Sequence, residues 1–129
     1  MSEEFKLDIV NPEKLFVSKN DVIEVVAPSL EGEMGILKNH ISIISFLKPG
    51  ILKLISKNNQ ESYFIEDGIL EFKDNELSIL TSTIFDLKNS DKTYISNSLK
   101  DAEKQLQNAD INDQKRYLLN QKIDTLRQI

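Results

Sequence analysis

Few residues of this chain have the type and spacing that catalysis requires. His40 is the only histidine, so no site can use two imidazole groups, and the lack of cysteine excludes thiol catalysis, disulfides and cysteine zinc sites. The nearest pair of carboxylates, Glu66 and Asp67, is adjacent in a segment that reads as a strand, where neighbouring side chains point to opposite faces. We find no nucleophile–base pair and no glycine-rich phosphate loop. The sequence therefore predicts a protein that is not an enzyme and holds no metal.

Composition narrows the class of protein further. The chain has 129 residues, of which 29% are charged and 40% hydrophobic, typical of one globular domain carrying a small appendage. A net charge of −5 speaks against nucleic-acid binding by general electrostatics. No apolar run approaches the ~18–20 residues of a membrane-spanning helix, and the first residues resemble no secretory signal. We expect neither a nucleic-acid partner nor direct membrane insertion.

The chain divides into two parts of different character. All four glycines and all three prolines precede residue 69, and these residues mark turns. The net charge is −6 over residues 1–90 and +1 over residues 91–129. These shifts predict a boundary near residues 88–91, with a first domain at 1–87 and a second at 88–129.

The first part reads as short strands. Phe5, Leu7 and Ile9 alternate with polar residues, which is typical of a strand with one buried face. A turn at 11–13 follows, because proline presets a turn dihedral. Strand-length apolar runs between turn signals predict an antiparallel β-sandwich or barrel. The further strands are expected at 21–27, 41–47, 51–55, 62–65, 69–72 and 77–84.

The second part reads as an antiparallel two-helix hairpin. Its two apolar stripes have helical spacing, and Asp110 is positioned to cap the second helix at its N-terminus, with Asp113 in the first turn. Two narrow stripes bury little area, so the hairpin needs a third surface, either the strands or a partner. The stripes consist of Ile95, Leu99, Ala102, Leu106 and Ala109, and of Leu119, Ile123 and Leu126.

A long pattern in the first part is specific enough to suggest a family. It runs Gly32-Glu-Met-Gly-Ile-Leu-Lys-Asn-His40, then Phe46-Leu-Lys-Pro-Gly50, with Tyr63-x-Ile-x-x-Gly-Ile-Leu-Glu71 further on. The chain resembles the epsilon subunit of rotary F-type ATP synthases over essentially its whole length. The resemblance implies an N-terminal β-sandwich followed by a C-terminal helical hairpin, in a non-catalytic subunit of the central stalk that couples proton flow to ATP synthesis.

The resemblance also implies two partners for the sandwich. Glu33 and Met34, in the tight loop after the third strand, match the contact to the membrane c-ring, and His40 matches a residue beside the gamma subunit. Ser42 stands where the family pattern usually has a proline. An acidic residue flanked by glycines is also commonly only solvated, and a lone histidine is commonly a loop or capping residue. Purely structural roles for Glu33 and His40 stay open.

The hairpin carries the regulatory expectations. In bacterial members it folds onto the sandwich or extends into the catalytic head, where it blocks ATP hydrolysis and meets acidic segments of the beta subunit. Solvent-facing helices carry lysines as well, so an ordinary surface is an equal alternative. Since Ala102 and Ala109 are the only small apolar residues here, we expect at most mild inhibition. The basic side chains that match are Lys104, Lys115, Arg116, Lys122 and Arg127.

Some family members also bind regulatory ATP between the two helices. Asp113 and Arg116 keep the spacing of that motif, and an arginine offers fork donors to phosphate while an aspartate accepts from an adenine amino group. Asn112 and Tyr117 depart from it, and an Asp–Arg pair within the helix is a sufficient explanation of the spacing. No cofactor is expected beyond this regulatory ATP.

Two further expectations complete the prediction. The resemblance implies a peripheral position on the cytoplasmic face of a bacterial inner membrane, with a plastid thylakoid as the weaker alternative. The functional alternative is a stand-alone β-sandwich that binds carbohydrate or peptide, because a fold does not determine a function. Such a module needs clustered exposed aromatic residues, and this chain has no tryptophan.

Overall fold

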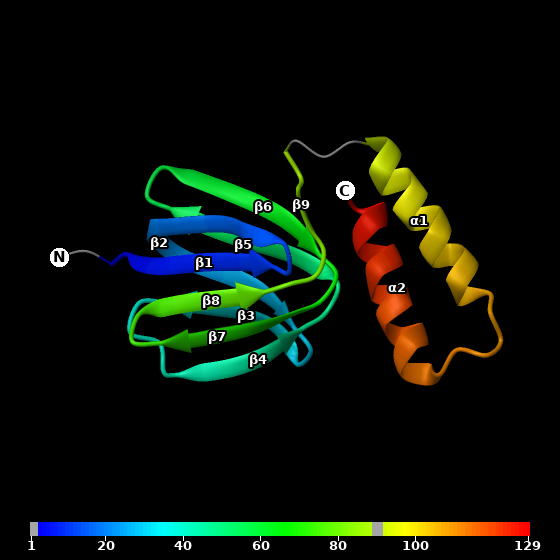
Figure 1. Cartoon of the computed structure of the whole chain (residues 1–129), viewed down its shortest axis with the longest axis horizontal. Helices are drawn as coiled ribbons and strands as arrows, with labels where there is room; N and C mark the ends of the chain where they lie inside the picture. Colours follow the sequence, from blue (N-terminus) through cyan, green and yellow to red (C-terminus); the bar gives the residue numbers. More distant parts are fainter. Residues whose placement is uncertain (1–2, 89–91) are drawn as a thin grey trace.

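The computed structural model describes residues 3–88 and 92–129, and it confirms a β-sandwich followed by a two-helix hairpin (Figure 1). The predicted domain boundary falls beside residues 89–91, which lie outside the described residues. Two helices follow the strands: α1 (Lys92–Leu106) and α2 (Asp113–Arg127). The strands in the described part are β1 (Phe5–Asn11), β2 (Lys14–Ser29), β3 (Gly32–Leu37), β4 (Ile43–Leu47), β5 (Gly50–Ser56), β6 (Asn59–Ile65), β7 (Gly68–Lys73), β8 (Glu76–Leu80) and β9 (Ile84–Asp86).

The long strand β2 joins the two layers of the sandwich. Its first half pairs with β1, and its second half lies between β3 and β5. From β5 the sheet continues through β6 to β9, while β1 continues through β8 and β7 to β4. Figure 1 shows β1, β8, β7 and β4 side by side on the near side of the sandwich. All these pairings are antiparallel except β1 with β8, which is parallel.

The core lies between the layers and follows the alternation visible in the sequence. Phe5, Leu7 and Ile9 of β1 are buried, as the period-two pattern predicts. Leu70 and Phe72 of β7 are also buried. The Phe72 ring packs edge to face on Phe5, with centroids 5.6 Å apart. Side chains from both layers form one cluster of buried residues. A close-packed core of this kind deforms little.

Several predicted boundaries are wrong. The segment 77–84 is not one strand, because β8 ends at Leu80 and β9 begins at Ile84. Thr81 lies in the break, buried, with its hydroxyl donating to Asp67 O at 2.7 Å. Strand β3 was not expected, since Gly32 and Gly35 suggested a loop. Glu66 and Asp67 lie between β6 and β7 rather than on a strand.

The hairpin forms as predicted, but its ends differ. Helix α1 ends at Leu106, so Ala109 lies beyond the helix and is exposed. Asn112, not Asp110, caps α2: its side chain accepts a hydrogen bond from Lys115 N at 2.7 Å. Asp113 is in the first turn, as expected. Ala102, Leu119 and Ile123 form a small buried cluster between the helices, separate from the sandwich core.

A close approach at Gly50 fixes the crossing of two strands. A Cβ atom on Gly50 would lie 2.6 Å from Cβ and 2.9 Å from Cγ of Pro28, both atoms of a rigid ring. At Gly35 an added Cβ would meet only the end of the Glu24 side chain, at 3.2 Å. Neither glycine has a positive φ, so the difference between them is one of space.

We therefore predict that Gly50→Ala destabilises the sandwich, because the added methyl pushes β5 away from Pro28. The free energy of unfolding should fall by about 1–3 kcal/mol, the usual cost of overpacking. Urea titration followed by circular dichroism measures this, with Gly35→Ala as the matched control. Equal stability of the two variants would contradict the steric argument.

Candidate interaction site

Apolar side chains gather on the outer face of β4, β7 and β8, where solvent is expected. Phe46 is 59% exposed, Ile69 42% and Leu80 49%. The strand registers pair Phe46 with Ile69 and Ile69 with Leu80, so the three side chains form one row across the strands. Ile44, 65% exposed, lies two residues further along β4 on the same face. We call these four residues the apolar row; contiguous exposed apolar surface of this kind marks an interaction site.

Glu33 and Met34 do not lie in a loop. Both belong to β3, where Glu33 pairs with Pro28 and is exposed, while Met34 packs against the core. The turn before β3 consists of Leu30 and Glu31. Gly32 follows with a φ of 131°, a value that favours glycine, so this glycine permits the turn. Glu33 therefore presents its carboxylate from a paired strand.

His40 lies at the other end of the sandwich from Glu33. It follows Asn39, which has a φ of 68° and donates from its backbone N–H to the Asn75 side chain at 2.7 Å. The His40 ring nitrogen Nδ1 is 2.7 Å from Ile41 O, and the ring meets Phe72 edge to face at 6.0 Å between centroids. The structure thus separates His40 from Glu33, and it places His40 just before the apolar row.

The basic residues of the hairpin occupy different environments. Lys122 forms an ion pair with Glu66 of the sandwich, and only 16% of its side chain is exposed. Arg127 pairs with Glu103 inside the hairpin, at 3.2 Å from Nη2 to Oε1. Lys104 and Lys115 are exposed. The five predicted beta-subunit contacts therefore do not form one patch in this conformation.

Asp113 and Arg116 have different structural roles. Arg116 Nη1 donates to Leu106 O at 3.3 Å, which ties α2 to the last turn of α1. Asp113 is exposed in the first turn of α2, where its charge suits the helix dipole. Tyr117 lies near the sandwich, with Lys48 Nζ 6.0 Å from its ring centroid. ATP binding at Asp113 and Arg116 stays a prediction.

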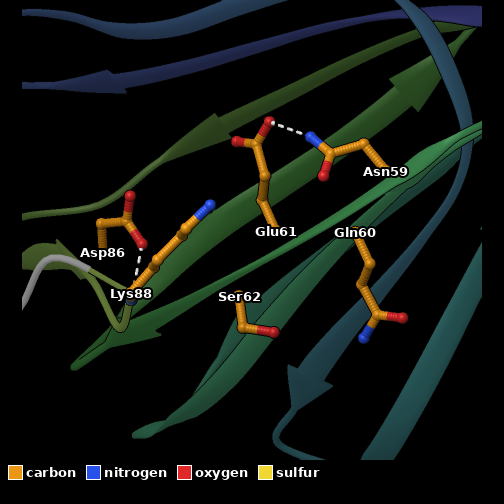
Figure 2. A pocket seen from close by; sticks show the side chains of 6 residues that line it. All are labelled: Asn59, Gln60, Glu61, Ser62, Asp86 and Lys88. Atoms are coloured by element: carbon orange, nitrogen blue, oxygen red, sulfur yellow. Dashed lines mark hydrogen bonds between the residues drawn. The ribbon is translucent and has the colours of Figure 1, made fainter.

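The sequence did not indicate a polar depression of about 430 Å³ at the root of the hairpin. Figure 2 shows Glu61 and Lys88 reaching into the same space, with Asp86 beside Lys88. Glu61 accepts hydrogen bonds from Asn59 Nδ2 at 3.2 Å and from the Tyr63 hydroxyl at 2.5 Å, and it forms an ion pair with Lys19. No sequence pattern links these residues, since Lys19 is 42 positions away from Glu61.

The environment of Glu61 favours its charged form. Burial raises the pKa of Glu61, but the hydrogen bonds from Lys19 and Tyr63 and the charges of Lys19 and Lys88 outweigh burial and hold this pKa below 4.5. Burial and the negative Glu61 raise the pKa of the Tyr63 hydroxyl, so this group stays protonated. The cluster fixes β6 and the point where the chain leaves the sandwich.

The described residues form neither a metal cluster nor a membrane-spanning helix. Within residues 3–88 and 92–129, no three histidine or acidic side chains lie close enough together to hold a metal ion. Neither α1 nor α2 combines the length and apolar character that crossing a membrane requires, and these are the helices of the described segments.

The fold and these surfaces define the chain as a β-sandwich that carries a docked two-helix hairpin and offers surfaces for contact. The family model for the β-sandwich domain of the ATP synthase delta/epsilon chain matches residues 4–86. The ATP synthase epsilon chain of Pelagibacter ubique (strain HTCC1062) is 63% identical over 127 residues, which cover 98% of each chain. The chain therefore belongs to the ATP synthase epsilon chain family.

More distant relatives agree with this assignment. The epsilon chain of Clostridium botulinum (strain Hall) is 33% identical over 84% of this chain and 81% of its own length. A chain in the cryo-EM structure of the Euglena gracilis mitochondrial ATP synthase superposes with a TM-score of 0.79 at 20% identity, covering 99% of this chain and 82% of that one. At this identity the superposition shows the fold alone. The comparisons give no support to a stand-alone carbohydrate- or peptide-binding module.

We predict that Glu61→Gln destabilises the protein in a pH-dependent way. Because the folded pKa of Glu61 lies below 4.5, its stabilising effect is fully present above pH 4.5 and is lost as the pH falls through the folded pKa. At pH 7 the variant should lose about 1 kcal/mol of unfolding free energy.

Urea titrations at pH 7 and at acidic pH test this expectation. The difference from the wild type should shrink as the pH falls below 4.5, the ordinary value for this carboxyl. Glu76→Gln, at an exposed position of β8, is the control and should show little change at either pH. A pH-independent loss in Glu61→Gln would show that the charge of Glu61 is not what matters.

Proposed function

We propose that this chain is the non-catalytic central-stalk subunit that joins the gamma subunit of an ATP synthase to the membrane c-ring during proton-driven ATP synthesis. The observation that carries the proposal is the apolar row on β4, β7 and β8. A large rotor subunit that covers this row would remove it from water. Each fully buried aliphatic or aromatic side chain contributes about 1.5–3 kcal/mol relative to exposure.

Gamma fits the row better than a transient partner does. The row is presented by the ordered strands of a close-packed sandwich, so little conformational entropy is lost on binding. Along the chain, Ile41 lies between His40 and the row, and it is 77% exposed. This continuity supports His40 as a gamma contact at the edge of the same surface.

The c-ring contact is proposed at the edge formed by β3. Glu33 is exposed there and pairs with Pro28 of β2, at the opposite end of the sandwich from His40. Met34 packs on the core and so supports the strand rather than the contact. The turn before β3 adjoins β4 through a hydrogen bond from Leu30 N to Phe46 O at 3.0 Å, so this edge and the apolar row are neighbouring surfaces of one body. A rigid body that presents two such surfaces can transmit torque without any reactive group. This role implies a peripheral position on the cytoplasmic face of a bacterial inner membrane.

The hairpin is proposed to inhibit ATP hydrolysis only mildly. Its docked form lies against the sandwich, and the transient contacts to the alpha and beta subunits require it to leave that position. Lys104 and Lys115 are exposed already, whereas Lys122 and Arg127 are engaged with Glu66 and Glu103. Release therefore breaks the ion pair between Lys122 and Glu66, which limits the inhibited state.

The gamma contact predicts a strong effect of Phe46→Asp. A charge in the middle of a buried apolar surface should weaken gamma binding at least about thirtyfold. The folded state should survive, since Phe46 is 59% exposed. Titration of the purified gamma subunit by calorimetry measures the Kd. Leu15→Asp, at a residue 57% exposed on β2, is the matched control; equal affinities for the two variants would disprove the assignment of this face.

The c-ring contact predicts a weaker effect of Glu33→Lys. Reversing a charge at the rim of an interface should lower ATP-driven proton pumping by about twofold or more in reconstituted vesicles. Gamma binding should stay unchanged, because the apolar row is untouched. Asp21→Lys is the control. Asp21 is also exposed on β2, but it precedes the residues that pair with β3. If the Glu33→Lys variant pumps protons as fast as the control, Glu33 does not contribute to the proposed contact.

A further inference from the structure

The seam between hairpin and sandwich is poorly filled. Figure 1 shows α2 alongside one end of the sandwich, with α1 on its far side. The buried cluster of the hairpin and that of the sandwich are separate. An open, largely apolar groove of about 600 Å³ lies along the seam. Phe46, Ile69 and Leu80 of the apolar row line it on the sandwich side, and Gln114 and Leu118 line it on α2, so the docked helix borders the row without covering it. Apolar burial along this stretch is therefore incomplete, and specific contacts must contribute to docking.

Among the described residues, contacts of three kinds cross the seam. At the root of the hairpin, the Phe85 ring of β9 meets Tyr94 of α1 edge to face, with centroids 5.1 Å apart. At the start of α2, Lys48 Nζ lies 6.0 Å from the Tyr117 ring, at the limit of a cation–π contact. Between these, Lys122 of α2 pairs with Glu66 of the sandwich. Tyr94 lies near the start of α1, close to the connection from the sandwich, so the Phe85–Tyr94 contact persists most readily when α2 moves.

The Lys122–Glu66 pair differs from an ordinary surface ion pair. Only 16% of the Lys122 side chain and 32% of the Glu66 side chain are exposed, so solvent screens the pair less than usual. Glu66 is held by its backbone, whose N–H donates to Thr83 O at 3.3 Å. The neighbouring Asp67 accepts hydrogen bonds from Ser82 N at 3.1 Å and Ser82 Oγ at 2.7 Å. Asp67 is thus bonded within the sandwich, and Glu66 is the carboxylate that pairs with Lys122.

Two other cations of the described hairpin residues, Arg127 and Arg116, do not bridge the seam in this way. Arg127 pairs with Glu103 of α1, and Arg116 donates to Leu106 O, so both hold the two helices together. These interactions move with the hairpin and cannot decide whether it is docked. Lys122 is the residue of the predicted beta-subunit set that the structure pairs with the sandwich.

We propose that the Lys122–Glu66 ion pair is an electrostatic latch that holds the hairpin on the sandwich, independently of any nucleotide. Breaking the pair undocks α2 and exposes Lys122. The latch is a property of the isolated chain. Its consequence, that the freed Lys122 becomes available to an acidic surface of the catalytic head, rests on the proposed function.

Distance measurement on the full chain tests the latch directly. The chain has no cysteine, so Ser78→Cys and Asp101→Cys accept two spin labels at exposed positions of β8 and α1. Pulsed electron paramagnetic resonance then reports the docked and undocked populations. In this background, Glu66→Gln should raise the undocked population about fivefold. High salt, about 1 M NaCl, should raise it in the parent chain but change the Glu66→Gln chain much less, because the Debye length falls to about 3 Å.

Two matched variants make the test specific. Glu103→Gln removes the more exposed Arg127–Glu103 ion pair inside the hairpin and should leave the distances unchanged. Glu66→Lys combined with Lys122→Glu restores the pair in reverse and should return the docked population, whereas Glu66→Lys alone should not. Circular dichroism confirms that each variant keeps its strands and helices.

Clear outcomes would overturn the proposal. A parent chain that is mainly undocked, a Glu66→Gln chain that matches the parent in both low and high salt, or a charge swap that fails to restore docking would each do so. These results do not depend on assembly with other subunits. If gamma binding fails instead, the proposed function is wrong and the latch stands.

Discussion

The single strand β2 is the constraint on which the rest of the structure depends. It pairs with β1 in one layer and with β3 and β5 in the other, so both layers share one covalent and hydrogen-bonded support. Gly50 lets β5 approach Pro28 on this strand, where any larger residue would collide. Because the interior is filled from both sides, the sandwich resists deformation. The surfaces that it presents therefore keep a fixed separation.

Charged residues of this protein mainly position its parts. Glu61 gathers Lys19, Asn59 and Tyr63 around one carboxylate, close to the point where the chain leaves the sandwich. Glu66, in the connection between β6 and β7, likewise fixes the position of another element, because it forms an ion pair with Lys122 of the hairpin. In both cases a partly shielded carboxylate meets a lysine that is distant in sequence. Such pairs stabilise an arrangement of elements, which suits a subunit whose function depends on shape and contact.

How far the sequence predicts the fold depends on how local the signal is. The alternation in β1 and the runs of β5 and β7 predict strands correctly, because one buried face imposes a period of two. Strand β3 was missed because its glycines resemble a loop, although Met34 and Ile36 face inward between exposed residues. The cap of α2 was placed two residues too early, since Asp110 and Asn112 are equally suitable by type and only the backbone geometry at Asn112 aligns its side chain with Lys115 N.

The sequence by itself determined the β-sandwich, the helical hairpin and, through the pattern around Gly32 and His40, the family, because these depend on side-chain periodicity and on residues close along the chain. Only the tertiary structure decided which residues that are distant in sequence come into contact. It placed Phe46, Ile69 and Leu80 in one exposed row through strand register. It also joined Lys122 to Glu66 through the docking of α2. Contacts of this kind leave no local pattern, since they arise when separately formed elements are brought together by burial of the core.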